Sequence, residues 1–204
     1  MRMENEVARH YDLLIDEGND PVLDPPALAA YMDGWDGGPF IDALCLDGTQ
    51  DVLEIGVGTG RLALRVADLC RTFTGVDISE KTIVRAAEHL AAYPQVQLIC
   101  ADFLAWETPA RFDVIYASLT FQHFADKRAA AQKVAQLLRP GGRAVISLNK
   151  DASGVIDYGT RVIPVFPDDP AVLAALMEDA GMAVQSIRET AFAHIITAVK
   201  AGRT

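Results

Sequence analysis

The stretch that most constrains this chain runs from Asp51 to Gly60 and reads DVLEIGVGTG. Its short apolar half predicts a buried strand over 52–55. The three glycines that follow in GxGxG spacing permit backbone angles closed to other residues and let a ligand approach the main chain. Apolar residues then recur at the spacing of one helix face, at Leu62, Val66, Leu69 and Cys70. Strand, glycine turn and helix form the arrangement in which a nucleotide-like ligand lies over the end of a sheet strand. Glycines kept only for a tight turn would give the same spacing.

Charge and cysteine usage narrow the partners. The 204 residues carry a net charge of −10, which weighs against a nucleic-acid or anionic-membrane surface, because both need clustered Lys and Arg. No apolar run approaches the ~20 residues of a membrane span. The three cysteines, Cys45, Cys70 and Cys100, lie in apolar contexts without a CxxC pair. They predict buried, reduced thiols in a cytoplasmic protein. The acidic net charge favours a small molecule as the partner. The sequence indicates no oligomeric state.

Local patterns predict one domain over 1–204. Within it, 1–46 is expected to be an N-terminal helical lid or substrate segment. It comprises helices over 4–17 and 24–32, a loop over 33–39 rich in glycine, and a short helix over 40–46. Residues 47–150 are expected to form the ligand-binding core. Residues 151–204 would supply a substrate loop, the last helix and a final strand pair.

The core and the final pair alternate strands with helices. Beyond 52–55, strands are predicted over 72–76, 96–100, 112–116, 144–148, 183–190 and 192–199, with a turn at 139–142. Ser79 and Asp169 are expected to cap helices, and Gly181 to end the last one. This order predicts an α/β fold with a doubly wound, mainly parallel seven-stranded sheet, helices on both faces and an antiparallel strand near the edge.

Acidic residues follow two successive strands at the same predicted edge, Asp77 and Asp102. A carboxylate after the second strand can accept hydrogen bonds from both ribose hydroxyls of an adenosine. One after the third strand can accept from the adenine amine, while Phe103 covers the ring. With the glycine turn, these residues describe one adenosine lying across the switch point of the sheet.

Five stretches in this order resemble the motifs of class I S-adenosylmethionine-dependent methyltransferases of the small-molecule type. They are Glu54–Gly60, Gly75–Ser79, Cys100–Phe103, Phe112–Ile115 and Leu138–Gly142. The resemblance implies a Rossmann-like methyltransferase fold, S-adenosyl-L-methionine as cofactor, and methyl transfer to an O or N acceptor. It covers about residues 50–150, and the final helix and strand pair fit the family's usual ending.

The same resemblance implies roles residue by residue. Gly56, Gly58 and Gly60 would let the backbone approach the methionine part of the cofactor, and Glu54 would organise its amino group. Asp77, followed by Ile78, would hold the ribose. Asp102 and Phe103 would hold the adenine, and Ser118 would lie beside the methionine tail or the transferred methyl. Tyr11 matches an N-terminal tyrosine that folds over the cofactor in many members.

His123 is the candidate catalytic residue, because it follows the fourth strand at the ligand edge. It is expected either to deprotonate the acceptor or to order its loop by hydrogen bonding. Residues 150–167 are too long for a simple connection, so together with Trp35 and the N-terminal helices they predict either an acceptor pocket or a surface hairpin. No metal is expected. A catechol-type Mg²⁺ site needs carboxylates after both the fourth and fifth strands, but the fourth strand ends in Ala117 and Ser118.

Two other functions share some of these features. A dehydrogenase would also place an acid near Asp77, but Arg61 stands where its third glycine is wanted for close helix packing. A protein that binds S-adenosylmethionine or S-adenosylhomocysteine without transferring a methyl would carry the same binding motifs. Turnover separates this second alternative from an enzyme.

Overall fold

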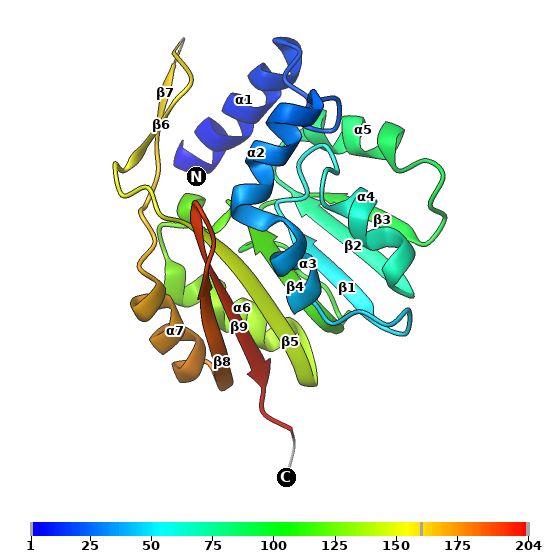
Figure 1. Ribbon diagram of the computed structural model, residues 1–204, viewed down its shortest axis with the longest axis vertical. Coiled ribbons are helices and arrows are strands. Elements are labelled where there is room, and N and C mark those ends of the chain that lie inside the picture. The colour runs from blue at the N-terminus through cyan, green and yellow to red at the C-terminus, as the bar shows by residue number, and fades with distance from the viewer. Residues whose placement is uncertain (1, 160, 203–204) are drawn as a thin grey trace.

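The computed structural model describes residues 2–159 and 161–202 and is built around a seven-stranded sheet of order β3-β2-β1-β4-β5-β9-β8 (Figure 1). The strands β1 to β5 are parallel, and β9 is antiparallel to both of its neighbours. The strands are β1 Asp51–Ile55, β2 Thr72–Asp77, β3 Val96–Cys100, β4 Phe112–Ser118, β5 Leu138–Asn149, β8 Met182–Glu189 and β9 Ala193–Lys200. The predicted mainly parallel sheet with an antiparallel strand near one edge is confirmed.

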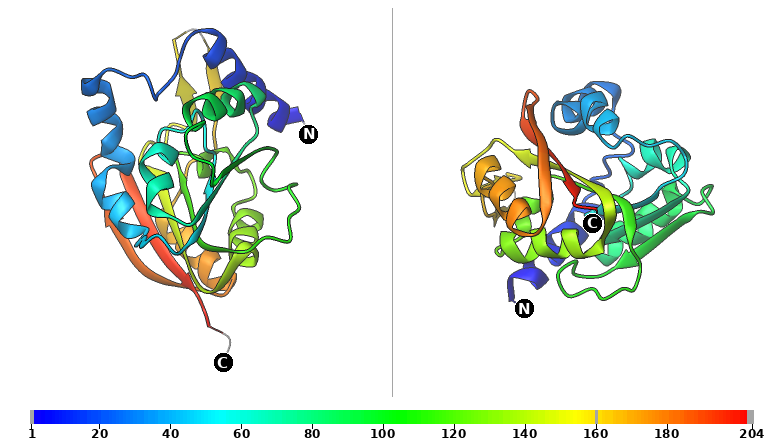
Figure 2. Two further views of the ribbon diagram at one scale, coloured as in Figure 1. Left: turned by 90° about the vertical axis from the view of Figure 1, so that its right-hand side faces the viewer. Right: turned by 90° about the horizontal axis from the view of Figure 1, so that it is seen from below.

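Helices cover both faces of this sheet, as the view from below in Figure 2 shows. They are α1 Arg2–Asp16, α2 Pro26–Asp36, α3 Gly38–Ala43, α4 Ala63–Val66, α5 Glu80–His89, α6 Lys127–Leu137 and α7 Pro170–Asp179, with 3₁₀ turns η1 Ala67–Leu69 and η2 Phe121–His123. Alternation along β1 sends Leu53 and Ile55 into the core with α6 and α7. Val52 faces the core formed with α3 and α5.

The predicted helix caps are confirmed. The Ser79 hydroxyl accepts from the Thr82 amide at 3.2 Å at the start of α5. Asp169 accepts from the Ala171 and Val172 amides at the start of α7. Gly181 follows that helix with φ +86°, the left-handed conformation that glycine adopts readily.

The predicted loop over 33–39 is wrong. Helix α2 runs on to Asp36, and α3 begins at Gly38. Three glycines disfavour a helix in this stretch, at about 1 kcal/mol for each glycine in a helix interior, but tertiary contacts of Trp35 and Asp36 outweigh that preference.

Other local differences have similar causes. The helix expected after the glycine turn is only the short α4 followed by η1, and the change to 3₁₀ winding leaves Leu69 42% exposed instead of buried. The expected turn at 139–142 is a bulge inside β5, because Leu138 and Arg143 pair with Phe112 and Val114 of the same neighbouring strand.

The cysteine prediction is partly wrong as well, because Cys70 is buried but Cys45 and Cys100 are exposed. All three thiols are free.

The segment 150–167 forms a small hairpin of β6 Val155–Asp157 and β7 Val162–Pro164, set apart from the main sheet beside α1 (Figure 1). No described helix is long and apolar enough to cross a membrane.

Candidate functional site

A cavity of about 690 Å³ opens at the carboxyl ends of β1, β2 and β4. Its walls come from segments far apart in sequence: α1, the glycine loop after β1, the loops after β2, β3 and β4, and the hairpin segment. Among the predicted site residues, those that line it are Tyr11, Glu54, Gly56, Gly58, Asp77, Ile78, Asp102, Phe103, Ser118 and His123. Gly60 is outside this lining, and a Cβ there would lie 3.2 Å from the Leu90 side chain.

The glycine loop approaches the loop after β4 very closely at Gly56. This residue has φ +75°, and a Cβ built on it would lie 2.2 Å from the Thr120 hydroxyl. That hydroxyl donates to the Ile55 carbonyl at 3.1 Å. Gly58 also has positive φ, but no other atom lies within 4 Å of a Cβ built there. The main chain at Gly58 therefore presents an open surface to a ligand.

Asp77 shapes the centre of the site. Its carboxylate accepts from the Gly58 amide and from the Ser79 amide, each at 2.9 Å, so it fixes both the glycine loop and the start of α5. Burial raises the pKa of this carboxyl above its ordinary value. A ligand hydroxyl donating to Asp77 would offset that loss of hydration.

Asp102 and Phe103 lie in the loop after β3. The Asp102 carboxylate accepts from the Leu104 amide at 2.9 Å and so turns its own loop. The Phe103 ring lines the cavity yet is 4% exposed, and it packs against Phe124 with ring centroids 5.9 Å apart. Lys133 lies over the same ring, 5.6 Å from its centroid. This arrangement gives the cavity one rigid aromatic wall.

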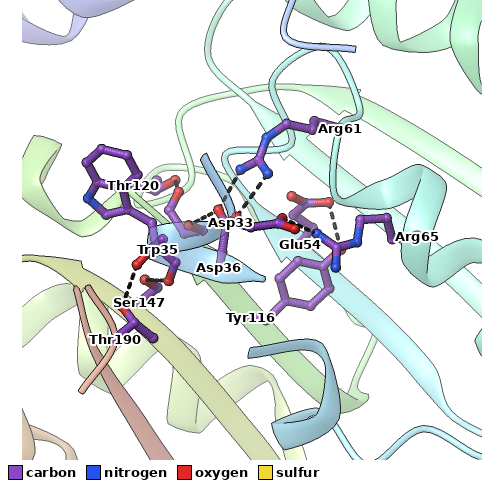
Figure 3. Close-up of polar contacts among 12 residues, drawn as sticks. Asp33, Trp35, Asp36, Glu54, Arg61, Arg65, Tyr116, Thr120, Ser147 and Thr190 are labelled. Carbon is purple, nitrogen blue, oxygen red and sulfur yellow. Dashed lines mark hydrogen bonds and ion pairs between the residues drawn. The ribbon is translucent and has the colours of Figure 1, made fainter. Parts of the chain in front are cut away.

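Glu54 is buried beside Tyr116, whose hydroxyl donates to its carboxylate at 2.8 Å (Figure 3). Burial raises the pKa of Glu54 well above its usual range, despite the nearby Arg61 guanidinium, which acts in the opposite direction. Glu54 thus places a carboxyl group with a high proton affinity at the end of the cavity next to the glycine loop.

Asp36, which is not among the residues predicted from the sequence, is fully buried at the end of α2. Arg61 donates to it from both terminal guanidinium nitrogens, at 2.9 and 2.5 Å, and the Ser118 hydroxyl donates at 2.5 Å (Figure 3). One carboxylate therefore joins the N-terminal segment, the glycine loop and the end of β4. The only sequence signal was an acidic residue in a glycine-rich stretch, which is typical of exposed loops.

Neighbouring contacts hold α2 in the position that this carboxylate needs. The Ser147 hydroxyl donates to the Trp35 carbonyl at 2.8 Å, and the Trp35 indole donates to Asn149 at 3.1 Å. The indole also packs against Phe192 with ring centroids 4.6 Å apart. These contacts anchor the end of α2 to β5 and to the β8–β9 turn. Figure 3 shows Ser147 of β5 beside Trp35.

At the other end of the cavity, Tyr11 reaches across from α1 to the loop after β4. Its hydroxyl lies 2.8 Å from His123 Nε2, in a hydrogen bond. Burial, together with the neighbouring His10 and Lys127, lowers the pKa of His123 from 6.5 to about 4, so this imidazole is neutral at pH 7. Its Nδ1 is buried with no hydrogen-bond partner. The same loop carries Leu119 at φ +56°, a strained conformation for a leucine.

Helix α1 is held over the site at two points. Asp12 accepts from the Ser79 hydroxyl at 2.7 Å and from the Lys81 amide at 3.1 Å. Arg161, beside β7, donates to Glu17 at 2.5 and 2.7 Å and to His10 Nδ1 at 2.9 Å. The hairpin and α1 therefore close over the cavity as one cover.

The polar groups of the cavity are arranged to suit an organic ligand. The described residues contain no group of three or more His, Cys, Asp or Glu side chains placed to hold a metal. The polar groups that line the cavity are spaced along its wall, from Glu54 through Asp77 to Asp102, and an aromatic ring stands at one end.

Comparison with known proteins also indicates that the cavity belongs to an organic-ligand enzyme, because the matches are methyltransferases. The family described as "Methyltransferase domain" matches residues 52–142. An uncharacterized methyltransferase of Geobacillus kaustophilus (strain HTA426) is 30% identical over 168 residues, which are 74% of this chain and 77% of that protein. A ubiquinone biosynthesis O-methyltransferase of Thiobacillus denitrificans (strain ATCC 25259 / T1) is 29% identical over 154 residues, 68% of this chain and 66% of that protein. For several curated relatives the chain spans only about half to two thirds of their length.

Among solved structures, magnesium protoporphyrin IX methyltransferase from Synechocystis PCC 6803 with bound SAH superposes with a TM-score of 0.78 at 17% identity. The match covers 98% of this chain and 100% of that one. At this identity the similarity establishes the fold alone.

Proposed function

Because the chain belongs to the class I S-adenosylmethionine-dependent methyltransferase family, we propose that it binds S-adenosyl-L-methionine and transfers its methyl group to a small-molecule O or N acceptor. One observation carries the proposal: a single cavity is lined by the open main chain at Gly58, by Asp77 and by Asp102. These groups lie in the loops after β1, β2 and β3, where an adenosine would cross the carboxyl edge of the sheet.

The proposed binding roles follow the order of the loops. Gly56 and Gly58 let the backbone pass close to the methionine part, and Glu54 faces its amino group. Gly60, which lies outside the cavity lining, serves the packing of this loop against Leu90. Asp77 and Ile78 hold the ribose. Asp102 and Phe103 hold the adenine. Ser118 and Tyr11 border the methionine tail and the sulfonium.

When bound, the cofactor supplies an electrophilic methyl group on a sulfonium. The protein's own contribution is then to hold the acceptor in line and to exclude water, which can supply much of the acceleration. The aromatic wall at Phe103 and the cover formed by α1 and the hairpin serve the second purpose. His123 is proposed to take the acceptor proton through Tyr11, whose hydroxyl it contacts at 2.8 Å.

The proposed partner is a small molecule. With a net charge of −10 the chain is not expected to bind nucleic acid or an anionic membrane. The free state of all three cysteines supports a reducing, cytoplasmic location.

Calorimetry with S-adenosylmethionine, S-adenosylhomocysteine and NADH tests the cofactor. We expect binding of the first two and none of NADH, and Asp77→Ala should weaken the binding by about 1–3 kcal/mol. Binding of NADH alone would refute the proposal. Tight binding of both S-adenosyl compounds, without turnover on a broad acceptor panel, would favour the non-catalytic alternative.

A further inference from the structure

The part of the cavity between α1 and the hairpin segment has a distinct chemistry, and we call it the acceptor end. Its apolar lining is Val7, Leu14, Ile15, Pro164 and Phe166. Its polar atoms belong to Tyr11, Tyr158 and His123. It presents hydroxyl and imidazole groups in an apolar surround, with no charged side chain among these lining residues.

The cationic side chains beside the acceptor end, Arg161 and Lys127, are already paired. Arg161 is bound to Glu17 by two short contacts. Lys127 forms an ion pair with Asp168 at 2.6 Å and also donates to two backbone carbonyls. Asp126, which lines the cavity on the same loop as His123, is occupied as the cap of α6. An anion entering the acceptor end would therefore lose its hydration without gaining a counter-ion, and a cation would meet only the exposed Asp126 carboxylate, which already caps α6.

Because the neighbouring cations are paired and Asp126 is engaged as a helix cap, the acceptor end favours acceptors that are uncharged at pH 7. An aliphatic amine resembles lysine, with an ordinary pKa of about 10.4, and would arrive at pH 7 as a cation. A phenol resembles tyrosine, with an ordinary pKa of about 10, and would arrive uncharged. Carboxylates and phosphates would arrive as anions. Of these four classes, the hydroxyl compound alone matches both the apolar lining and the polar atoms.

We propose that the acceptor is an uncharged, largely apolar hydroxyl compound of the phenol type, whose hydroxyl donates to the Tyr11 oxygen. This inference rests on the proposed function and specifies the substrate class of the same site. Tyr11, which the family resemblance places over the cofactor, is thereby assigned a direct contact with the acceptor.

The proton has a defined path in this arrangement. The acceptor oxygen forms a bond to the transferred methyl carbon, the carbon–sulfur bond breaks, and its electron pair stays on sulfur. The acceptor proton passes to the Tyr11 oxygen while the Tyr11 proton passes to His123 Nε2. This requires the neutral tautomer that carries its proton on Nδ1, which is buried without a hydrogen-bond partner, while Nε2 is bonded to Tyr11. His123 therefore acts through Tyr11 and not directly on the acceptor.

Binding of three matched phenols to the S-adenosylhomocysteine complex tests the substrate class without turnover. The probes are methyl 4-hydroxybenzoate, which is neutral, 4-hydroxybenzoate, which is an anion, and tyramine, which is a cation. We expect the neutral ester to bind at least about tenfold more tightly than either ion in calorimetry at pH 7. Equal or tighter binding of an ion would overturn the proposal, and so would failure of the ester to bind.

A charge introduced at the acceptor end tests where this preference arises. Ile15→Lys should shift the ratio of affinities toward 4-hydroxybenzoate by about tenfold. Val84→Lys is the matched control, because Val84 is 56% exposed on α5 and does not line the cavity. An unchanged ratio in Ile15→Lys would contradict the assignment of the acceptor end. Failure of S-adenosylhomocysteine to bind the wild type would instead refute the proposed function.

Discussion

Asp36 and Arg61 form a two-point ion pair, with nitrogen–oxygen distances of 2.9 and 2.5 Å, between the end of α2 and the residue directly after the glycine loop. The carboxylate has no exposed surface. Arg61 occupies the position where a dinucleotide-binding turn would need glycine. In this protein its long side chain reaches the carboxylate at the end of α2. The glycine loop is therefore held from outside the nucleotide-binding core.

Replacing Asp36 tests how much this pair contributes. Asp36→Asn leaves the Arg61 charge without its counter-ion, and breaking a buried pair in this way costs about 3–5 kcal/mol. We expect a loss of that size in the free energy of unfolding from urea titrations. Affinity for S-adenosylhomocysteine should fall too, because the glycine loop loses its support.

Asp33 provides a matched control on the same helix. It pairs with Arg65 at 2.8 Å, but the two side chains are 48% and 36% exposed. Exposed pairs contribute about 0–1 kcal/mol, so Asp33→Asn should change the stability little. Equal losses in the two variants would show that burial is not what distinguishes the Asp36 pair.

Gly56 offers a second test of the glycine loop. Gly56→Ala combines a positive φ, which costs about 1–2 kcal/mol, with a Cβ placed 2.2 Å from the Thr120 hydroxyl. Gly18→Ala at φ +80° meets no atom within 4 Å and isolates the conformational cost alone. In thermal unfolding we expect Gly56→Ala to be the more destabilised of the two. A smaller loss than in Gly18→Ala would mean that Thr120 moves aside freely.

The sheet could be predicted from sequence because its signals are local. Each parallel strand contains a short apolar run, and the first three are followed closely by a glycine or end at or near an acid, at Gly56, Asp77 and Asp102. Ser79 and Asp169 mark the starts of their helices. The acids after β2 and β3 follow from the same pattern, because the carboxyl ends of parallel strands share one edge. Both were placed in the cavity wall by sequence alone.

The extension of α2 over 33–36 could not be predicted in the same way. Its last helical turn is stabilised by Arg61, Ser118 and Ser147, which lie 25 to 112 positions away. Hydrophobic periodicity and helix propensity are local properties of the sequence and carry no information on contacts at that separation. The hydrogen bond between Tyr11 and His123, 112 positions apart, could not be predicted for the same reason, although each residue is by itself a predicted site residue.

The lowered pKa of His123 predicts a pH-dependent stability. Burial lowers the pKa from 6.5 to about 4, so the unfolded chain binds more protons than the folded chain between these values. The stability from the neutral imidazole is complete above pH 6.5 and is lost as the pH falls toward 4. Between pH 6.5 and 5 the wild type should lose about 2 kcal/mol at this site.

Urea titrations of His123→Gln at several pH values would isolate this loss. The variant should have a flatter pH dependence than the wild type over the same interval, and His194→Gln serves as a histidine control in β9. Parallel curves for the wild type and His123→Gln would contradict the lowered pKa.

If His123 acts through Tyr11, the two residues should behave as one unit in catalysis. Tyr11→Phe and His123→Ala should each lower the turnover of a phenol acceptor by about 10²–10⁴-fold while leaving S-adenosylhomocysteine affinity nearly unchanged. The double variant should be no slower than the slower single variant. Additive losses would indicate separate roles, and a pH–rate inflection that survives His123→Ala would argue against the imidazole as the base.

The contacts of Arg161 between the hairpin segment and α1 lead us to expect that it slows ligand release. Its guanidinium joins the hairpin segment to α1 through Glu17 and His10, and both of its carboxylate contacts lie near the outer surface. Exposed contacts add little to global stability but can hold two mobile segments together. Arg161→Gln should therefore leave the unfolding temperature almost unchanged while S-adenosylhomocysteine dissociates about three- to tenfold faster in stopped-flow displacement. Arg128→Gln removes a comparable exposed pair with Asp179, away from the cavity, and should not alter the dissociation rate. If the two variants release the ligand at the same rate, the pair between Arg161 and Glu17 does not hold the cover closed.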